Sequence, residues 1–72
     1  MNLSDTKPGQ LLRIVSIDDP DAESQMIRMG LASGDMITCL TRLPAGPTVV
    51  KCAGVEVALG RELAQKIRVE VA

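Results

Sequence analysis

Short runs of alternating apolar and polar residues recur along the chain and predict β-strands. The run at residues 55–59 alternates, so Val55, Val57 and Leu59 should share a dry face opposite a wet one. Residues 67–71 alternate in the same way. Other apolar runs rich in β-branched residues lie at residues 11–17, 36–42 and 48–53. We therefore expect five short strands.

A helical pattern lies between the first two predicted strands. Asp19 suits the N-cap position and Pro20 the first helical position. The apolar residues that follow fall on one helix face: Ala22, Met26 and Met29. Gly30 predicts a left-handed helix ending, in which Leu31 folds back onto Met26. One more helical turn is expected at residues 61–65, before the last strand.

The turns between these elements predict how the strands are arranged. Pro8-Gly9, Ser33-Gly34-Asp35, Ala53-Gly54 and the loop at residues 43–47 each carry turn-forming residues. Five short strands around a small core are best satisfied by a partly open antiparallel β-barrel, because curling hides most strand edges. We expect one mainly β domain over residues 1–72.

The composition narrows the function. The chain has 72 residues, 46% of them apolar, and no Phe, Tyr or Trp, so the core must be aliphatic with Met. Eight basic and nine acidic residues give a net charge of −1. Nucleic acid is therefore not an expected partner, because neither a basic surface nor aromatic stacking platforms are available.

The apolar runs are also too short for membrane insertion. A helix that spans a bilayer needs about 20 apolar residues, and the acidic, polar N-terminus does not resemble a signal peptide. Two cysteines without a targeting segment fit a reducing compartment. We expect a cytoplasmic protein without direct membrane insertion.

Several segments in a fixed order resemble the FeoA family of ferrous iron transport proteins. They are Pro8-Gly9, Arg13-Ile14-Val15-Ser16-Ile17, Arg28-Met29-Gly30-Leu31, Ser33-Gly34-Asp35, Gly46-Pro47 and the run at residues 61–69. The resemblance covers almost the whole chain. Two positions depart from the family pattern: Gly60 stands where a basic residue is usual, and Ser33 where proline is frequent.

The resemblance to FeoA implies a fold and a partner. It implies an SH3-like barrel in the cytoplasm that assists FeoB, a membrane iron transporter whose cytoplasmic part includes a GTP-binding domain. The same barrel resembles the C-terminal domain of iron-dependent repressors. The alternative function is therefore that of a free-standing barrel domain in metal-dependent regulation.

Catalysis finds little support in the residues. The chain has no histidine, so it lacks the usual general base, and no GxxxxGK[ST] or GxGxxG segment is present. Arg28, Arg42 and Arg61 are candidates for an arginine that stabilises a phosphoryl transition state, but surface arginines are ordinarily solvated. We expect no enzyme activity and no cofactor.

Two groups of residues deserve comparison with metal sites. The carboxylates near the helix start, Asp18, Asp19, Asp21 and Glu23, are explained by capping and by the helix dipole. Cys39 and Cys52 lie on the two arms of the predicted hairpin and would face one another across a turn at residues 45–46. Two thiolates make half of a tetrahedral site, so a second copy or another ligand would be needed. We expect buried, free thiols instead.

The predicted contact surface for a partner combines the end of the helix with the hairpin tip. Its residues are Met26, Met29, Leu31, Leu43 and Pro44. These segments place apolar side chains where a small barrel would otherwise carry polar ones. The expected partner is the cytoplasmic part of a FeoB-type transporter, and a weak homo-oligomer is also compatible with the sequence.

Overall fold

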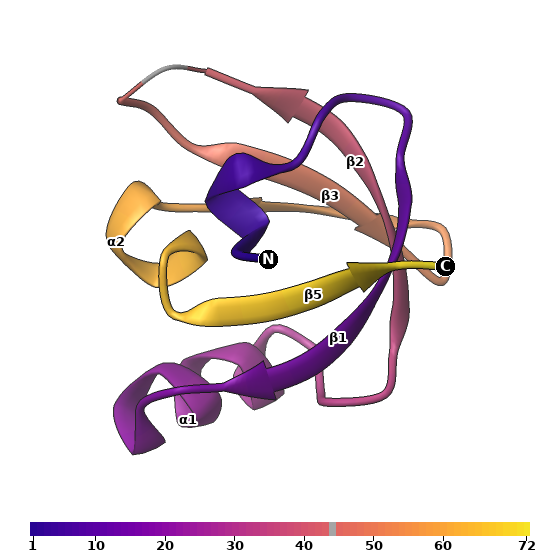
Figure 1. Ribbon diagram of the computed structural model, residues 1–72. Helices are drawn as coiled ribbons and strands as arrows, with labels where there is room; N and C mark the ends of the chain where they lie inside the picture. Colours follow the sequence, from indigo (N-terminus) through magenta and orange to yellow (C-terminus); the bar gives the residue numbers. More distant parts are fainter. Residues whose placement is uncertain (44) are drawn as a thin grey trace.

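The computed structural model describes residues 1–43 and 45–72 (Figure 1). In chain order the elements are η1 (Leu3–Asp5), β1 (Leu11–Ile17), α1 (Pro20–Arg28), β2 (Met36–Arg42), β3 (Thr48–Cys52), β4 (Val55–Leu59), α2 (Arg61–Ala64) and β5 (Ile67–Val71). β1, β2, β4 and β5 have the predicted bounds. Within the described ranges, no helix is long and apolar enough to cross a bilayer.

The five strands form one antiparallel sheet in the order β4-β3-β2-β1-β5. Figure 1 shows that the sheet curves strongly around its interior. β4 and β5 lie at its two ends and do not pair with one another, so the barrel stays open. The prediction of a partly open, five-stranded antiparallel barrel with a helix between the first two strands is confirmed.

The first residues of the chain cover the outer edge of β5. The Val69 N–H donates to the Met1 carbonyl at 2.7 Å. Leu3 in η1 is completely buried, and the buried Thr6 hydroxyl donates to the Leu3 carbonyl at 2.7 Å. The sequence predicted only a polar arm here, because a single leucine among polar residues carries no periodic signal.

The core is aliphatic, as the composition requires. Along β1, Leu12 and Ile14 are buried whereas Leu11 and Arg13 are exposed, which is the alternation expected for a sheet with one buried face. Every strand and helix contributes to the buried cluster: Leu3, Leu12, Ile14, Met26, Leu31, Ile37, Cys39, Val50, Leu59, Ala64, Ile67 and Val69.

α1 ends in a Schellman motif. The Leu31 N–H donates to the Met26 carbonyl at 2.8 Å, and the Gly30 N–H donates to the Ile27 carbonyl at 3.0 Å. Gly30 has a φ of +85°, a conformation that side chains with a Cβ rarely adopt. The predicted helix ending is confirmed, and it turns Met26 and Leu31 together into the core.

The β2–β3 hairpin contains a bulge that changes the predicted register. The ladder shifts by one residue at Leu40, and Cys39 pairs with Val50. The prediction that Cys39 faces Cys52 is wrong, because it assumed a two-residue turn at residues 45–46 and an uninterrupted ladder. A bulge leaves one residue unpaired and displaces every later pair.

The β3–β4 connection is a tight turn at Ala53 and Gly54. Their φ values are +51° and +82°, and a turn with positive φ at both central residues is type I′. The predicted turn is confirmed. The predicted strand of residues 48–53 ends one residue early, at Cys52, because Ala53 already has the turn conformation.

The inward-facing residues of β4 are fully buried only at the C-terminal end of the strand. Leu59 is fully buried, Val57 is half-buried and Val55 is 60% exposed. The strand was expected to have one uniformly dry face. Because β4 lies at the edge of the sheet, the start of the strand extends past the core instead.

Candidate partner-binding site

A groove of about 450 Å³ lies between α1 and α2, the two helices on the left in Figure 1. Its apolar lining comes from Ala22 and Met29 on one side and Leu63 on the other. Met29 follows α1 directly and is 41% exposed. Polar side chains complete the lining: Gln25, Arg61, Glu62 and Lys66.

An ion pair joins the start of α1 to the segment that follows α2. Lys66 Nζ lies 3.0 Å from Asp19 Oδ2, and the Lys66 carbonyl accepts the Asp18 N–H at 2.9 Å. The hydrogen bond from Lys66 lowers the pKa of the Asp19 carboxyl, and the N–H of Asp21 adds to this effect. The same bond to Asp19 raises the pKa of Lys66. These two contacts therefore connect the α1 side of the groove to the α2 side.

A smaller hollow of about 30 Å³ lies beside the β2–β3 hairpin. Arg42 and Leu43 line it from the end of β2, and Arg61 lines it from α2. Arg42 Nη1 donates to the Ser4 carbonyl at 3.0 Å, which connects the hairpin to η1. Because Arg61 also lines the groove, the two hollows adjoin.

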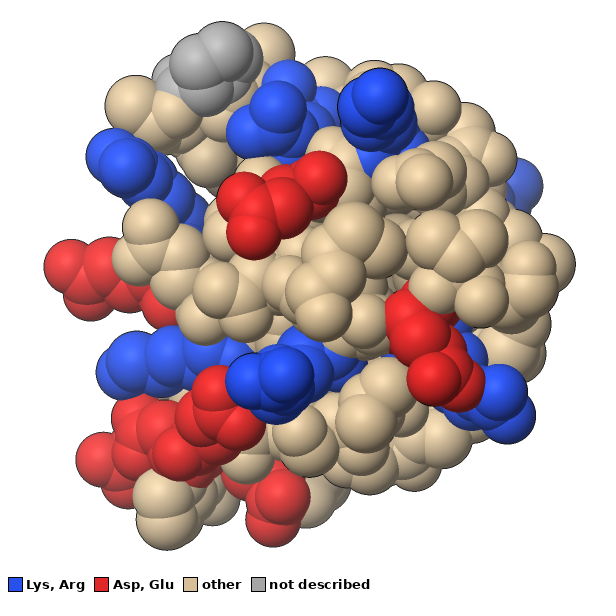
Figure 2. Space-filling model, viewed as in Figure 1, with Lys and Arg blue, Asp and Glu red and all other residues tan. Residues whose placement is uncertain are grey.

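Some basic side chains that line these hollows form an ion pair with a carboxylate, and others do not. Among the described residues, the ion pairs are Arg13–Glu70 and Lys66–Asp19, so Lys66 is paired whereas Arg42 and Arg61 are not. In Figure 2 most acidic side chains of this face gather at the lower left, over the start of α1. Basic side chains lie along the upper edge, near the hairpin, and also across the middle of this face.

Comparison with known proteins decides the family. A model of the FeoA domain matches residues 1–71. The chain belongs to the FeoA family. A solved iron uptake regulatory protein (FeoA) is 32% identical with a TM-score of 0.91, and the match covers 100% of this chain and 97% of that one. The FeoA protein from Chlorobium tepidum is 29% identical with a TM-score of 0.84, over 99% of this chain and 70% of that one.

The FeoA fold also occurs inside larger proteins. ScaR with bound Zn²⁺ is 24% identical with a TM-score of 0.90, and the match covers 100% of this chain but 37% of ScaR. At that identity the likeness shows the fold alone. The same fold is found in part of a manganese-dependent transcriptional repressor, which is also 24% identical. A comparison with curated protein sequences gives no match.

The structure separates the predicted contact residues of this FeoA domain. Met29 and Leu43 are 41% and 53% exposed, and each lines one of the two hollows. Met26 and Leu31 are 0% and 1% exposed, so the prediction that they lie on the contact surface is wrong. The Schellman ending of α1 directs both side chains inward. Pro44 lies outside the described residues.

The contribution of α2 to the site was not predicted. Arg61 and Leu63 were expected to form part of a helical turn, with no place in a contact surface. The sequence contains a weak signal, since a basic residue precedes an apolar one in a segment too short to bury both. The proximity of α2 to α1 and to the hairpin arises only when the sheet closes around the core.

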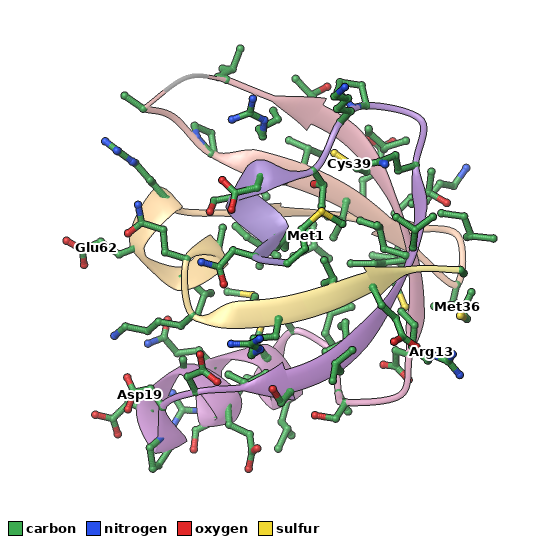
Figure 3. All side chains as sticks on the ribbon, viewed as in Figure 1. Met1, Arg13, Asp19, Met36, Cys39 and Glu62 are labelled. Carbon is green, nitrogen blue, oxygen red and sulfur yellow. The ribbon has the colours of Figure 1, made fainter. Side chains whose placement is uncertain are left out.

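The two cysteines are free and inequivalent. Cys39 is fully buried, and Figure 3 shows it inside the barrel, which confirms the expectation for this thiol. Cys52 is only half-buried. Burial raises the pKa of the Cys52 thiol, and the negative charge of Asp35 raises it further. The Cys52 thiol is therefore protonated at neutral pH.

One residue of the acidic cluster, Asp19, caps the start of α1. Asp19 Oδ1 accepts the Asp21 N–H at 3.3 Å, and Figure 3 shows Asp19 at the beginning of α1. The predicted capping role is confirmed for this residue. In the part of the chain that the structure describes, no three His, Cys, Asp or Glu side chains are grouped closely enough to hold a metal ion.

Proposed function

We propose that this protein is an accessory component of ferrous iron uptake that binds the cytoplasmic part of a FeoB-type membrane transporter. The observation that carries the proposal is the FeoA family match over residues 1–71. The structural likeness to an iron uptake regulatory protein at 32% identity supports the same assignment. The protein would accordingly reside in the cytoplasm.

The chemistry of the site supports binding as its mode of action. Met29 and Leu43 offer exposed apolar side chains, and methionine adapts readily to a partner surface. Arginine side chains provide hydrogen bonds to carboxylates at the rim. We propose no resident cofactor and no catalytic residue, and any GTP chemistry belongs to the transporter. Arg28, Arg42 and Arg61 act as surface cations in this proposal.

A binding titration tests the proposal. The purified protein is titrated against the cytoplasmic part of the transporter in its nucleotide-free, GDP-bound and GTP-analogue-bound forms. We expect saturable binding to at least one of these forms. Absence of binding to all three contradicts the proposal. Sedimentation velocity at several concentrations of the protein alone measures any weak homo-oligomer.

Metal-dependent regulation is the second candidate function. The likeness to ScaR, with a TM-score of 0.90, favours it because the same fold forms part of that protein. A manganese-dependent transcriptional repressor is also similar, with a TM-score of 0.87 over 41% of its chain. A gene for a DNA-binding regulator beside this one would support regulation, and a gene for a large membrane GTPase would support the transporter.

A further inference from the structure

We propose that the groove between α1 and α2 and the hollow beside the hairpin form one docking surface. It takes a segment of a partner protein in which an apolar side chain is flanked by carboxylates. The proposal rests on the proposed function, because the transporter is the partner expected to carry this segment. Arg61 lies between the two hollows and lines both, so a single segment can reach them together.

The groove fits an apolar side chain that a larger partner presents. Ala22 is small and fully buried, so it leaves depth between the helices, while Leu63 is half-buried and Met29 is 41% exposed. The volume of about 450 Å³ lies within the range of ligand pockets. Small-molecule pockets are mostly apolar, whereas half of this lining is polar. An apolar side chain that belongs to a partner protein fits such a mixed lining better than a free small molecule does.

The charges around the groove select carboxylates. Arg42 and Arg61 are exposed and belong to neither of the ion pairs among the described residues. An arginine fork binds a carboxylate through two parallel hydrogen bonds. Glu62 also lines the groove, but Figure 3 shows it on the outer side of α2. Lys66 is held by Asp19, so Arg42 and Arg61 against Glu62 leave a net positive charge on this surface.

Leu43 extends the surface toward the hairpin. It is 53% exposed and lines the smaller hollow together with Arg42 and Arg61. Arg42 is held in place by its bond to the Ser4 carbonyl, so this arginine is positioned in advance of binding. An exposed apolar side chain that shares a hollow with two arginines is the complement of a partner segment in which acidic and apolar residues alternate.

Charge reversal at Arg61 tests the surface. Arg61→Glu should preserve the fold, because the side chain is exposed and a carboxylate is favourable in the first turn of a helix. Arg68→Glu is the matched control, since Arg68 is exposed on β5 and lines neither hollow. Thermal melts verify that both variants remain folded. Both are then titrated against the cytoplasmic part of the transporter at two salt concentrations.

We expect Arg61→Glu to weaken binding at least about tenfold and Arg68→Glu to change it less than about threefold. The affinity of the unmodified protein should fall as salt rises, and that of Arg61→Glu should fall less. Equal affinities of the two variants overturn the docking surface while leaving the proposed function intact.

A peptide selection decides the inference even if the transporter does not bind. Random displayed peptides are selected on the unmodified protein and then tested on Arg61→Glu. We expect sequences that combine Asp or Glu with an aliphatic or aromatic residue, and we expect them to lose binding to the variant. Backbone amide shifts on titration should concentrate at the residues that line the two hollows, in the ranges 22–29, 42–43, 45–48 and 60–66. Selected peptides without acidic residues, or shifts located elsewhere, overturn the inference.

Discussion

Ala53 adopts a backbone conformation that suits other residues better. Its φ of +51° lies in the left-handed region, where a residue with a Cβ is disfavoured by about 1–2 kcal/mol. Asparagine tolerates this region and is preferred before glycine in type I′ turns. We predict that Ala53→Asn stabilises the protein by about 0.5–1 kcal/mol, measured by urea unfolding.

Ala58→Asn is the control for that substitution. Ala58 is exposed within β4, where asparagine is disfavoured by the extended strand. The control should therefore be neutral or slightly destabilising. If both variants gain stability equally, surface polarity rather than turn geometry explains the effect.

Met29 and Met26 are three residues apart but differ completely in exposure, at 41% and 0%. We predict that Met29→Glu and Leu43→Glu weaken partner binding by about 1 kcal/mol or more and leave the melting temperature nearly unchanged. Met26→Glu should unfold the domain, because burying an unpaired carboxylate costs several kcal/mol. Thermal melts beside binding titrations measure both effects. Unchanged affinity in Met29→Glu and Leu43→Glu contradicts the contact surface.

The start of α1 responds to pH through the Asp19–Lys66 pair. The pKa of Asp19 is lowered, so its contribution is present above about pH 4 and is lost as pH falls through the folded-state pKa. The pKa of Lys66 is raised, so its contribution is present below about pH 10 and is lost as pH rises further. Between these limits the pair stabilises the fold.

Asp19→Asn isolates this ion pair from helix capping. Asparagine caps helices as well as aspartate, but it carries no charge. We predict that the variant is less stable than the unmodified protein between about pH 5 and about pH 9, and that the difference shrinks below about pH 3. Chemical denaturation across this range measures it. A constant difference at every pH would show that capping, and not charge, is responsible.

The strands and α1 could be predicted because their signals are local. Asp19-Pro20 marks one end of α1 and Gly30 the other, and both act within one helical turn. The register of the β2–β3 hairpin could not be predicted in the same way. Nothing near Leu40 indicates a bulge, since a bulge depends on how the strand bends over the core.

The candidate site also combines residues with a local sequence signal and residues whose position depends on the whole fold. Met29 and Leu43 could be predicted because they are apolar residues at a helix end and at a hairpin, where a sequence normally has polar residues. Arg61 could not, because its position between the groove and the hairpin requires the sheet to bring residues 42 and 61 to one place. Met26 was misplaced because the direction of a side chain at a Schellman ending depends on the packing beneath it.

The N-terminal segment adds a buried side chain to the core that the five strands enclose. Leu3 is fully buried in the core, so we predict that Leu3→Ala lowers the free energy of unfolding by about 2–5 kcal/mol. Ser4→Ala should change it by less than about 0.5 kcal/mol, because Arg42 binds the Ser4 main-chain carbonyl and not its side chain. Urea unfolding compares them. If both variants lose the same free energy of unfolding, the segment acts through its backbone and not through the Leu3 side chain.

The aliphatic core has an optical consequence. With no Phe, Tyr or Trp, the protein contributes almost no near-ultraviolet absorbance or intrinsic fluorescence. Unfolding must therefore be followed by far-ultraviolet circular dichroism or by amide resonances. In a mixture with a partner that contains tryptophan, the emission comes entirely from the partner. Its change on titration then reports the complex without a label and without background from this chain.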